Sequence, residues 1–114
     1  MIVFYHNPKC SKSRKALKFL QEGKEEICLI HYLESSLSFD EVEKLLKKLD
    51  MDPRDLMRKN EKKYKELNLD VSSLGRFELI QAIVDHPCLM QRPIVVFKDE
   101  AIIARPPEKV MRFL

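Results

Sequence analysis

The first fourteen residues constrain the fold most, because they combine a strand, a chain break and a helix start. Ile2–Tyr5 is apolar, β-branched and aromatic, which is typical of a strand. Asn7-Pro8 interrupts that strand, and a helical pattern begins at about Ser11. The pattern predicts a strand–loop–helix unit that places Cys10 at the N-terminus of a helix.

Cys10 is the best candidate for a nucleophile. Unpaired backbone N–H groups and the positive end of a helix dipole favour a thiolate at this position, so we expect the pKa of Cys10 to be lowered. Lys9, Lys12 and Arg14 add positive charge. A cysteine that only fills a core usually lies within an apolar run, whereas Cys10 follows Pro8 among polar residues. The sequence therefore predicts a reactive thiol.

A metal site is the weaker interpretation of the same region, because His6 and Cys28 do not have the paired spacing of a zinc site. We expect no bound metal and no bound cofactor.

Length and charge limit the class of protein. The 114 residues are enough for one domain, residues 1–114, with 45% hydrophobic and 34% charged residues. Basic and acidic residues number 21 and 18 and are mixed along the chain, which gives no support for nucleic-acid binding. No run of apolar residues is long enough to span a membrane, and no signal peptide is apparent. Three widely spaced cysteines favour the reducing cytoplasm, and we expect a monomer.

The remaining pattern divides into sheet-forming ends and a helical middle. After a first helix with Gly23 as a candidate C-cap, the apolar run Ile27–Leu33 predicts a strand buried on both faces, with Cys28 in the core. From about residue 34 to residue 86 the signals are helical. They are a Ser38–Glu41 capping box before a helix that runs through Leu49, an Asp52-Pro53 start, a short exposed helix within Lys59–Asn68, a loop at Leu69–Gly75, and an amphipathic helix with Phe77, Ile80, Ile83 and Val84 on its apolar face.

The C-terminal part predicts a hairpin and a helix. Strands Ile94–Lys98 and Ala101–Ala104 are joined by Asp99-Glu100, and Glu108–Leu114 is suited to a final helix. The order β-α-β, helical insertion, β-β-α predicts an α/β, thioredoxin-like fold with a mixed sheet. In that connectivity Pro93, which is a candidate for a cis peptide bond, precedes the third strand beside the thiol.

Three arginines adjoin strand ends or chain breaks. Arg92 and Arg105 bracket the hairpin, and Arg58 follows the short proline-started helix. A guanidinium group binds a tetrahedral oxyanion through two parallel hydrogen bonds, which lysine cannot match. Taken singly, each arginine is more commonly a surface residue. In a thioredoxin-like layout, however, we expect Arg92 to lie close to Cys10.

Six segments together resemble the glutaredoxin-coupled arsenate reductase family, over nearly the whole chain. They are His6–Arg14, His31–Glu34, Leu56–Asn60, His86-Pro87, Arg92–Val96 and Arg105-Pro106. The resemblance implies that Cys10 attacks arsenate, that Arg58, Arg92 and Arg105 hold the oxyanion, and that His6 and Ser13 help to keep the thiolate. It also implies glutathione as a co-substrate and glutaredoxin as a partner.

Ser13 occupies the position where a dithiol reductase carries its second cysteine, so reducing power must come from outside unless Cys28 or Cys88 reaches Cys10. Two alternatives stay open. One is a glutathione-dependent thiol oxidoreductase without arsenate activity. The other is a non-enzymatic regulator that binds RNA polymerase, for which a Cys-x-x-Cys switch is expected. Ser13 and the arginines favour the arsenate reductase, while Lys12 and Cys88 leave the oxyanion and the electron donor open.

Overall fold

The computed structural model describes residues 1–35 and 37–114, which belong to two compact units. The first unit contains residues 1–35 and 92–114, and the second contains residues 36–91. The predicted insertion over residues 34–86 falls almost entirely in the second unit. In the part of the chain that the structure describes, no helix is long and apolar enough to cross a membrane.

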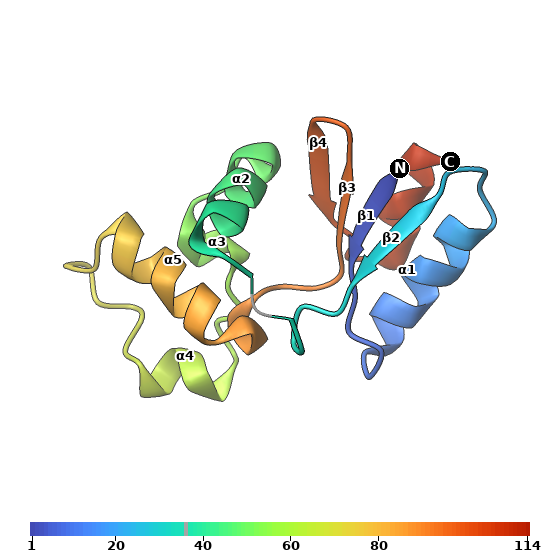
Figure 1. The fold of residues 1–114 in the computed structure, drawn as a ribbon. Helices are drawn as coiled ribbons and strands as arrows, with labels where there is room; N and C mark the ends of the chain where they lie inside the picture. Colours follow the sequence, from blue (N-terminus) through green and yellow to red (C-terminus); the bar gives the residue numbers. More distant parts are fainter. Residues whose placement is uncertain (36) are drawn as a thin grey trace. The chain divides into compact units, whose positions relative to one another are not determined.

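The first unit is built on a mixed sheet whose described strands lie in the order β2-β1-β3-β4 (Figure 1). The central strand β1, Ile2–Tyr5, is parallel to β2, Ile27–Ile30, and antiparallel to β3, Ile94–Phe97. The strand β4, Glu100–Ile103, pairs antiparallel with β3. This arrangement confirms the predicted α/β class and the predicted β-α-β and β-β-α connectivity.

The prediction for β2 was wrong in length and in burial. The strand ends at Ile30 because His31 begins a turn, in which Glu34 N and Ser35 N donate to the His31 carbonyl at 3.0 and 2.9 Å. It is also an edge strand. Leu29 is 41% exposed and Cys28 is only half-buried, so Cys28 is not a core residue. A short apolar run does not reveal whether its strand lies at the centre or at the edge of a sheet.

One helix and one 3-10 segment pack on this sheet. The helix α1 runs over Ser11–Gln21, and the 3-10 helix η2 runs over Pro107–Phe113. The core that they form with the sheet contains Ile2, Phe4, Ala16, Leu20, Val95, Ala104 and Val110. Two details differ from the predictions. Glu22, in the right-handed helical region, is the C-cap of α1 instead of Gly23, and the C-terminal helix has 3-10 geometry.

The hairpin turn lies one residue earlier than predicted. Phe97 pairs with Glu100, so Lys98-Asp99 forms the two-residue connection, and Lys98 adopts a left-handed φ of 58°. Lysine is not a typical left-handed turn residue, which is why the sequence pattern misplaced the turn. The sequence left the isomer of Pro93 open; the Arg92–Pro93 bond is cis, and Arg105–Pro106 is cis as well.

The second unit is helical, as predicted. Its elements are α2 Phe39–Leu49, α3 Pro53–Leu56, α4 Lys62–Glu66, α5 Arg76–Asp85 and the 3-10 helix η1 Pro87–Leu89. It extends beyond residue 86 because Met57 and Met90 form an antiparallel bridge and Gln91 N donates to the Leu56 carbonyl at 2.7 Å. These contacts join the end of η1 to the segment that precedes Arg58.

The buried face of α5 is shifted relative to the prediction. Leu79, Ile80 and Ile83 are buried, whereas Phe77 is 65% exposed and lies against Phe39, with the ring centroids 5.0 Å apart. Leu79, Ile80 and Ile83 already form an apolar stripe with helical spacing, so Phe77 is left outside the core.

The start of α2 offers a direct test of local stability. Ser38 Oγ accepts from Glu41 N at 3.1 Å, and Glu41 Oε1 accepts from Ser38 N at 3.2 Å, as the capping box predicted. Replacing Ser38 with alanine is expected to lower the free energy of unfolding by about 1 kcal/mol, because an N–H group of the first turn loses its acceptor. Thermal unfolding should show a midpoint lower by roughly 4 °C. Ser72→Ala, at an exposed loop position, is the control, and an equal loss in both variants would contradict the capping role.

Candidate functional site

Cys10 lies at the N-cap of α1, where the turn after β1 presents it to the first N–H groups of the helix. Its backbone is extended, with φ −95° and ψ 122°, and the helix begins at Ser11. Asn7 shapes the turn: its side-chain oxygen accepts from Lys9 N at 3.0 Å, and its carbonyl accepts from Cys10 N at 3.0 Å. An Asx turn of this kind, followed by proline, is a sequence-encoded reason for the bend.

Arg14 closes the same loop from the helix side. Its guanidinium Nη1 donates to the Pro8 carbonyl at 2.8 Å, so the two ends of the Cys10 loop are joined by a charge-assisted hydrogen bond. We predicted that the charge of Arg14 favours the thiolate. In the structure, the guanidinium is hydrogen-bonded to the Pro8 carbonyl and thereby holds the loop.

The surroundings of Cys10 favour the thiolate. Burial alone raises the pKa of the thiol, but the backbone N–H of Ser13, the Arg92 guanidinium and the backbone N–H of Lys12 together lower it below its ordinary value. Among the described residues, the thiol makes no capping hydrogen bond of conventional geometry. These donors nevertheless lie near enough to favour a negative charge on the sulfur, which is the physical basis of a reactive cysteine.

The side chains of His6 and Ser13 form a buried pair beside this loop. His6 Nδ1 and Ser13 Oγ are 2.7 Å apart, and Asn7 N donates to Ser13 Oγ at 3.1 Å. His6 is 5% exposed and Ser13 is fully buried. Ser13 therefore offers its backbone N–H to Cys10 while its hydroxyl faces His6, and we infer that any influence of His6 on the thiolate passes through Ser13.

The surroundings of His6 disfavour its protonated form. Burial lowers the pKa of His6, and the positive charges of His31 and Arg14 lower it further. The rings of His6 and His31 lie edge-on, with their centroids 5.7 Å apart. The sequence does not reveal this contact, because only the parallel register of β1 and β2 places His31 next to His6.

Arg92 is the predicted arginine that the structure brings to Cys10. It stands just before Pro93, and its guanidinium lies beside the thiol. Within the described residues, Arg92 Nε is a buried side-chain nitrogen that has no hydrogen-bond partner. A buried donor without an acceptor is costly, which makes this nitrogen a candidate contact for a bound anion.

Arg105 belongs to the same unit and follows β4. Its backbone N donates to the Ile103 carbonyl at 2.9 Å, and its side chain is exposed. In the described part of the chain its guanidinium has no hydrogen bond or ion pair. The side chain is thus free to bind an external anion.

Arg58 belongs to the second unit and is already paired. Its Nη1 donates to Glu61 Oε2 at 2.9 Å, and both side chains are partly buried. The nearby Cys88 thiol has a raised pKa, because burial and the Glu61 carboxylate disfavour its thiolate. The ion pair with Glu61 was not predicted, although the three-residue spacing on the chain permits it. The contribution of Arg58 to an oxyanion site stays a prediction.

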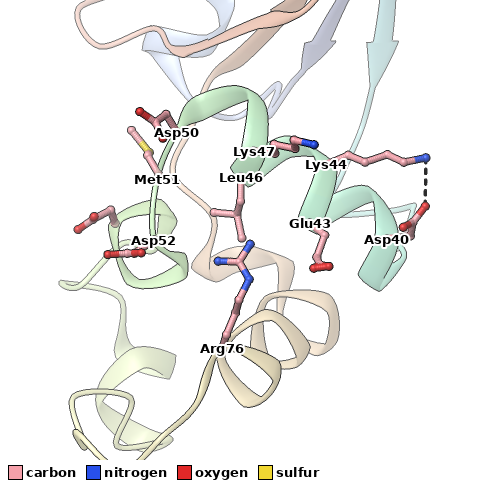
Figure 2. A pocket seen from close by; sticks show the side chains of 10 residues that line it. Asp40, Glu43, Lys44, Leu46, Lys47, Asp50, Met51, Asp52 and Arg76 are labelled. Atoms are coloured by element: carbon pink, nitrogen blue, oxygen red, sulfur yellow. Dashed lines mark ion pairs between the residues drawn. The ribbon is translucent and has the colours of Figure 1, made fainter.

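A hollow of about 490 Å³ lies on the second unit, but its lining is unsuited to the predicted chemistry. Figure 2 shows Arg76 reaching into it toward Leu46, and Lys44 paired with Asp40 at 3.1 Å. Its other charged residues are Glu43, Lys47, Asp50, Asp52 and Asp55. Carboxylates outnumber cations in this lining, so an oxyanion would be repelled, and we place the candidate active site at Cys10.

The comparisons with known proteins show the family of the chain. The family model described as ArsC matches residues 5–113. The Escherichia coli K12 protein YfgD is 49% identical over 114 residues, covering 99% of this chain and 96% of that protein. A Haemophilus influenzae protein named arsenate reductase is 42% identical, covering 99% and 98%. The solved structure of an arsenate reductase from Vibrio cholerae superposes with a TM-score of 0.95 at 45% identity, covering 99% of this chain and 97% of that one. The family match spans almost the entire chain, including Cys10, Arg92 and Arg105, and the chain therefore belongs to the ArsC family.

Proposed function

We propose that the protein is an arsenate reductase that uses Cys10 as its nucleophile and external thiols as its reductant. The observation that carries the proposal is the pairing of a thiol whose pKa is lowered with the Arg92 guanidinium, whose buried Nε lacks an acceptor. The relatives named arsenate reductase support the choice of oxyanion.

The charge of the substrate explains why an arginine must stand beside the thiol. Arsenate near neutral pH is largely a dianion, so an approaching thiolate is repelled unless cations neutralise the arsenate oxygens. In this proposal Arg92 acts on both reactants, because its charge favours the Cys10 thiolate and its N–H groups can donate to an arsenate oxygen. Arg105, with its free guanidinium, is the second proposed contact, and Arg58 is the third.

The proposed reaction consumes two thiols. The Cys10 thiolate attacks arsenic, an S–As bond forms, and one As–O bond breaks, with the oxygen leaving as water after protonation. Glutathione then attacks the adduct. The two thiols supply the two electrons that reduce As(V) to As(III), so arsenite leaves and Cys10 remains in a mixed disulfide with glutathione. A glutaredoxin thiolate then attacks the glutathione sulfur of this disulfide, takes up the glutathione in a new mixed disulfide and releases the Cys10 thiol; a second glutathione reduces glutaredoxin and leaves as oxidised glutathione.

The reductant is expected to be external because residue 13 is a serine. Arsenite formation should require glutathione together with glutaredoxin, and thioredoxin alone should not sustain turnover. The measurement is arsenite produced per protein with each donor, with the Cys88→Ser variant as the control for an internal resolving thiol. Turnover with thioredoxin that is lost in Cys88→Ser would replace this scheme with an internal disulfide.

The same assay separates the proposed function from its closest rival. Native protein that reduces glutathione mixed disulfides but forms no arsenite would be a thiol oxidoreductase of the alternative kind. Arsenite formation that saturates with arsenate and is competed by another tetrahedral oxyanion supports the proposal. We assign the reaction to the reducing cytoplasm, in which the three free cysteines stay reduced.

A further inference from the structure

The sheet of the first unit gathers positive charge at the end that holds Cys10. The end of β1, the start of β3 and the end of β4 lie together, so the topology brings Cys10, Arg92 and Arg105 to one end of the sheet. Among the described residues of this unit, Glu34 and Glu108 are the carboxylates that follow a strand at that end, and Glu108 is already in an ion pair. The opposite end mixes both signs of charge, with Glu22, Lys24, Glu25, Glu26, Lys98, Asp99 and Glu100.

Two cations of the Cys10 loop have no partner within the described part of the chain. Lys9 and Lys12 stand on either side of the nucleophile in sequence, and both side chains are exposed. Neither ammonium group forms an ion pair or a hydrogen bond there, whereas the Arg14 guanidinium is bound to a carbonyl. Their backbones are held, since Lys9 N donates to Asn7 Oδ1 at 3.0 Å and Lys12 lies in the first turn of α1. The two lysines are thus flexible cations on a fixed loop.

The second reactant of the proposed reaction is itself an anion. Glutathione has two carboxylates and one ammonium group, so it carries negative charge near neutral pH, and its thiolate form carries more. It must reach a sulfur that already bears an arsenic oxyanion, and like charges repel each other unless cations lie at the loop. The proposed contacts to the arsenate oxygens are arginines, which leaves Lys9 and Lys12 available to the incoming thiol.

The size of glutathione suits the spacing of these lysines. A tripeptide spans roughly 10 Å when extended, at about 3.5 Å per residue. With its central sulfur at Cys10, its carboxylate ends can meet cations from the residue before Cys10 and from the second residue after it. An ammonium group on a flexible stem fits this task, because a carboxylate that arrives from solvent does not present one fixed geometry.

We propose that Lys9 and Lys12 form a recognition site for the carboxylates of glutathione at the rim of the Cys10 loop, and that they select an anionic thiol as the reductant. The inference rests on the proposed function for the external thiol, and it deepens that function by naming the groups through which the thiol is recognised. It also gives a role to Lys12, which the sequence alone left without one.

The test is disulfide exchange at Cys10 with probes that differ in charge, and it needs no arsenate. The Cys10 thiolate attacks one sulfur of the probe, a new S–S bond to Cys10 forms, the probe disulfide breaks and one probe thiolate leaves. Oxidised glutathione is the anionic probe and 2-hydroxyethyl disulfide is the neutral one, with the modified Cys10 peptide quantified by mass spectrometry. The readout is the ratio of the two rate constants, because a change in the thiolate fraction of Cys10 affects both probes and cancels.

Lys9→Gln and Lys12→Gln should each lower this ratio roughly threefold at low salt, the effect of one charge pair about 7 Å apart in water, and the double variant should lower it roughly tenfold. Added salt should lower the ratio in the native protein and change it little in the double variant, because the attraction is screened. The rate with the neutral probe should stay near native in every variant, which also shows that the variants are folded.

Lys18→Gln is the matched control, since it removes an exposed lysine from the last turn of the same helix. It lies about 12 Å along α1 from Cys10 and should change the ratio by less than about 1.5-fold. The proposal is overturned if neither lysine of the loop affects the ratio, or if Lys18→Gln lowers it equally, since net charge would then explain the attraction. No exchange with either probe in the native protein would overturn the assignment of Cys10 as the nucleophile and this inference with it, so the two failures are distinguishable.

Discussion

Replacing Cys10 with serine is expected to abolish arsenite formation, lowering the rate by roughly three orders of magnitude or more, because a serine hydroxyl without an activating base is a far weaker nucleophile. Cys28→Ser and Cys88→Ser should each retain near-native rates. Loss of activity in either control, with a folded protein, would contradict the assignment of Cys10 as the single essential thiol.

The same cysteine should be distinguished by its pH profile. The pKa of Cys10 is lowered and the pKa of Cys88 is raised, so at neutral pH Cys10 carries the larger thiolate fraction. As the pH falls through the lowered pKa, the Cys10 thiolate is protonated and its alkylation slows. As the pH rises toward the ordinary range for thiols, its rate reaches a plateau. Preferential labelling of Cys28 or Cys88 at neutral pH would contradict the site.

Replacing Arg92 with alanine is expected to cause the second large loss. The variant loses a charge-assisted contact to the oxyanion, worth roughly 1.5–3 kcal/mol, or about one to two orders of magnitude in kcat/KM for arsenate. It also loses the cation beside Cys10, so the alkylation midpoint should move to higher pH. Arg92→Lys should recover part of the thiolate shift but little of the arsenate rate, since an ammonium group lacks the planar fork.

Arg112→Ala is the matched control for Arg92, because it removes the same charge from the same unit. Arg112 forms an exposed ion pair with Glu100, and both side chains are more than half exposed. Its loss should leave the arsenate rate within about twofold, as exposed pairs contribute little. Equal losses of kcat/KM for arsenate in the Arg92 and Arg112 variants would show that the net charge of the protein, and not a specific binding site, attracts the substrate. Alanine variants of Arg58 and Arg105 test the remaining two predicted contacts in the same assay.

Features encoded by local chemistry were predictable from the sequence. The capping box at Ser38, the proline start of α3 and the turn before Cys10 are specified by neighbouring residues, and each appears where it was predicted. The position of Arg92 beside the thiol followed from the thioredoxin-like connectivity, which the mixed sheet bears out.

Features that depend on tertiary neighbours were not predictable in this way. The edge position of β2 depends on which strands surround it, and the exposure of Phe77 depends on which side of α5 meets the core. The His6–His31 contact needs the strand register, and the Arg58–Glu61 pair needs the local path of the chain after α3. In each case the residues can be read from the sequence, but which neighbour they contact is decided by the tertiary structure.

The first unit is discontinuous in sequence, which affects the order in which its strands can pair during synthesis on the ribosome. The central strand β1 is among the first residues to emerge, yet its antiparallel partner β3 follows the whole of the second unit, and Tyr5 pairs with Ile94. Such a distant pairing carries the entropic cost of closing a long loop, so it forms slowly compared with local contacts. The described residues 37–91 of the second unit are contiguous, so its contacts span shorter stretches of chain than the pairing of β1 with β3 does. The Ser13 and Lys12 N–H groups lie within α1 and emerge early, so we expect only the share of the lowered Cys10 pKa that Arg92 supplies to appear after Arg92 has left the exit tunnel.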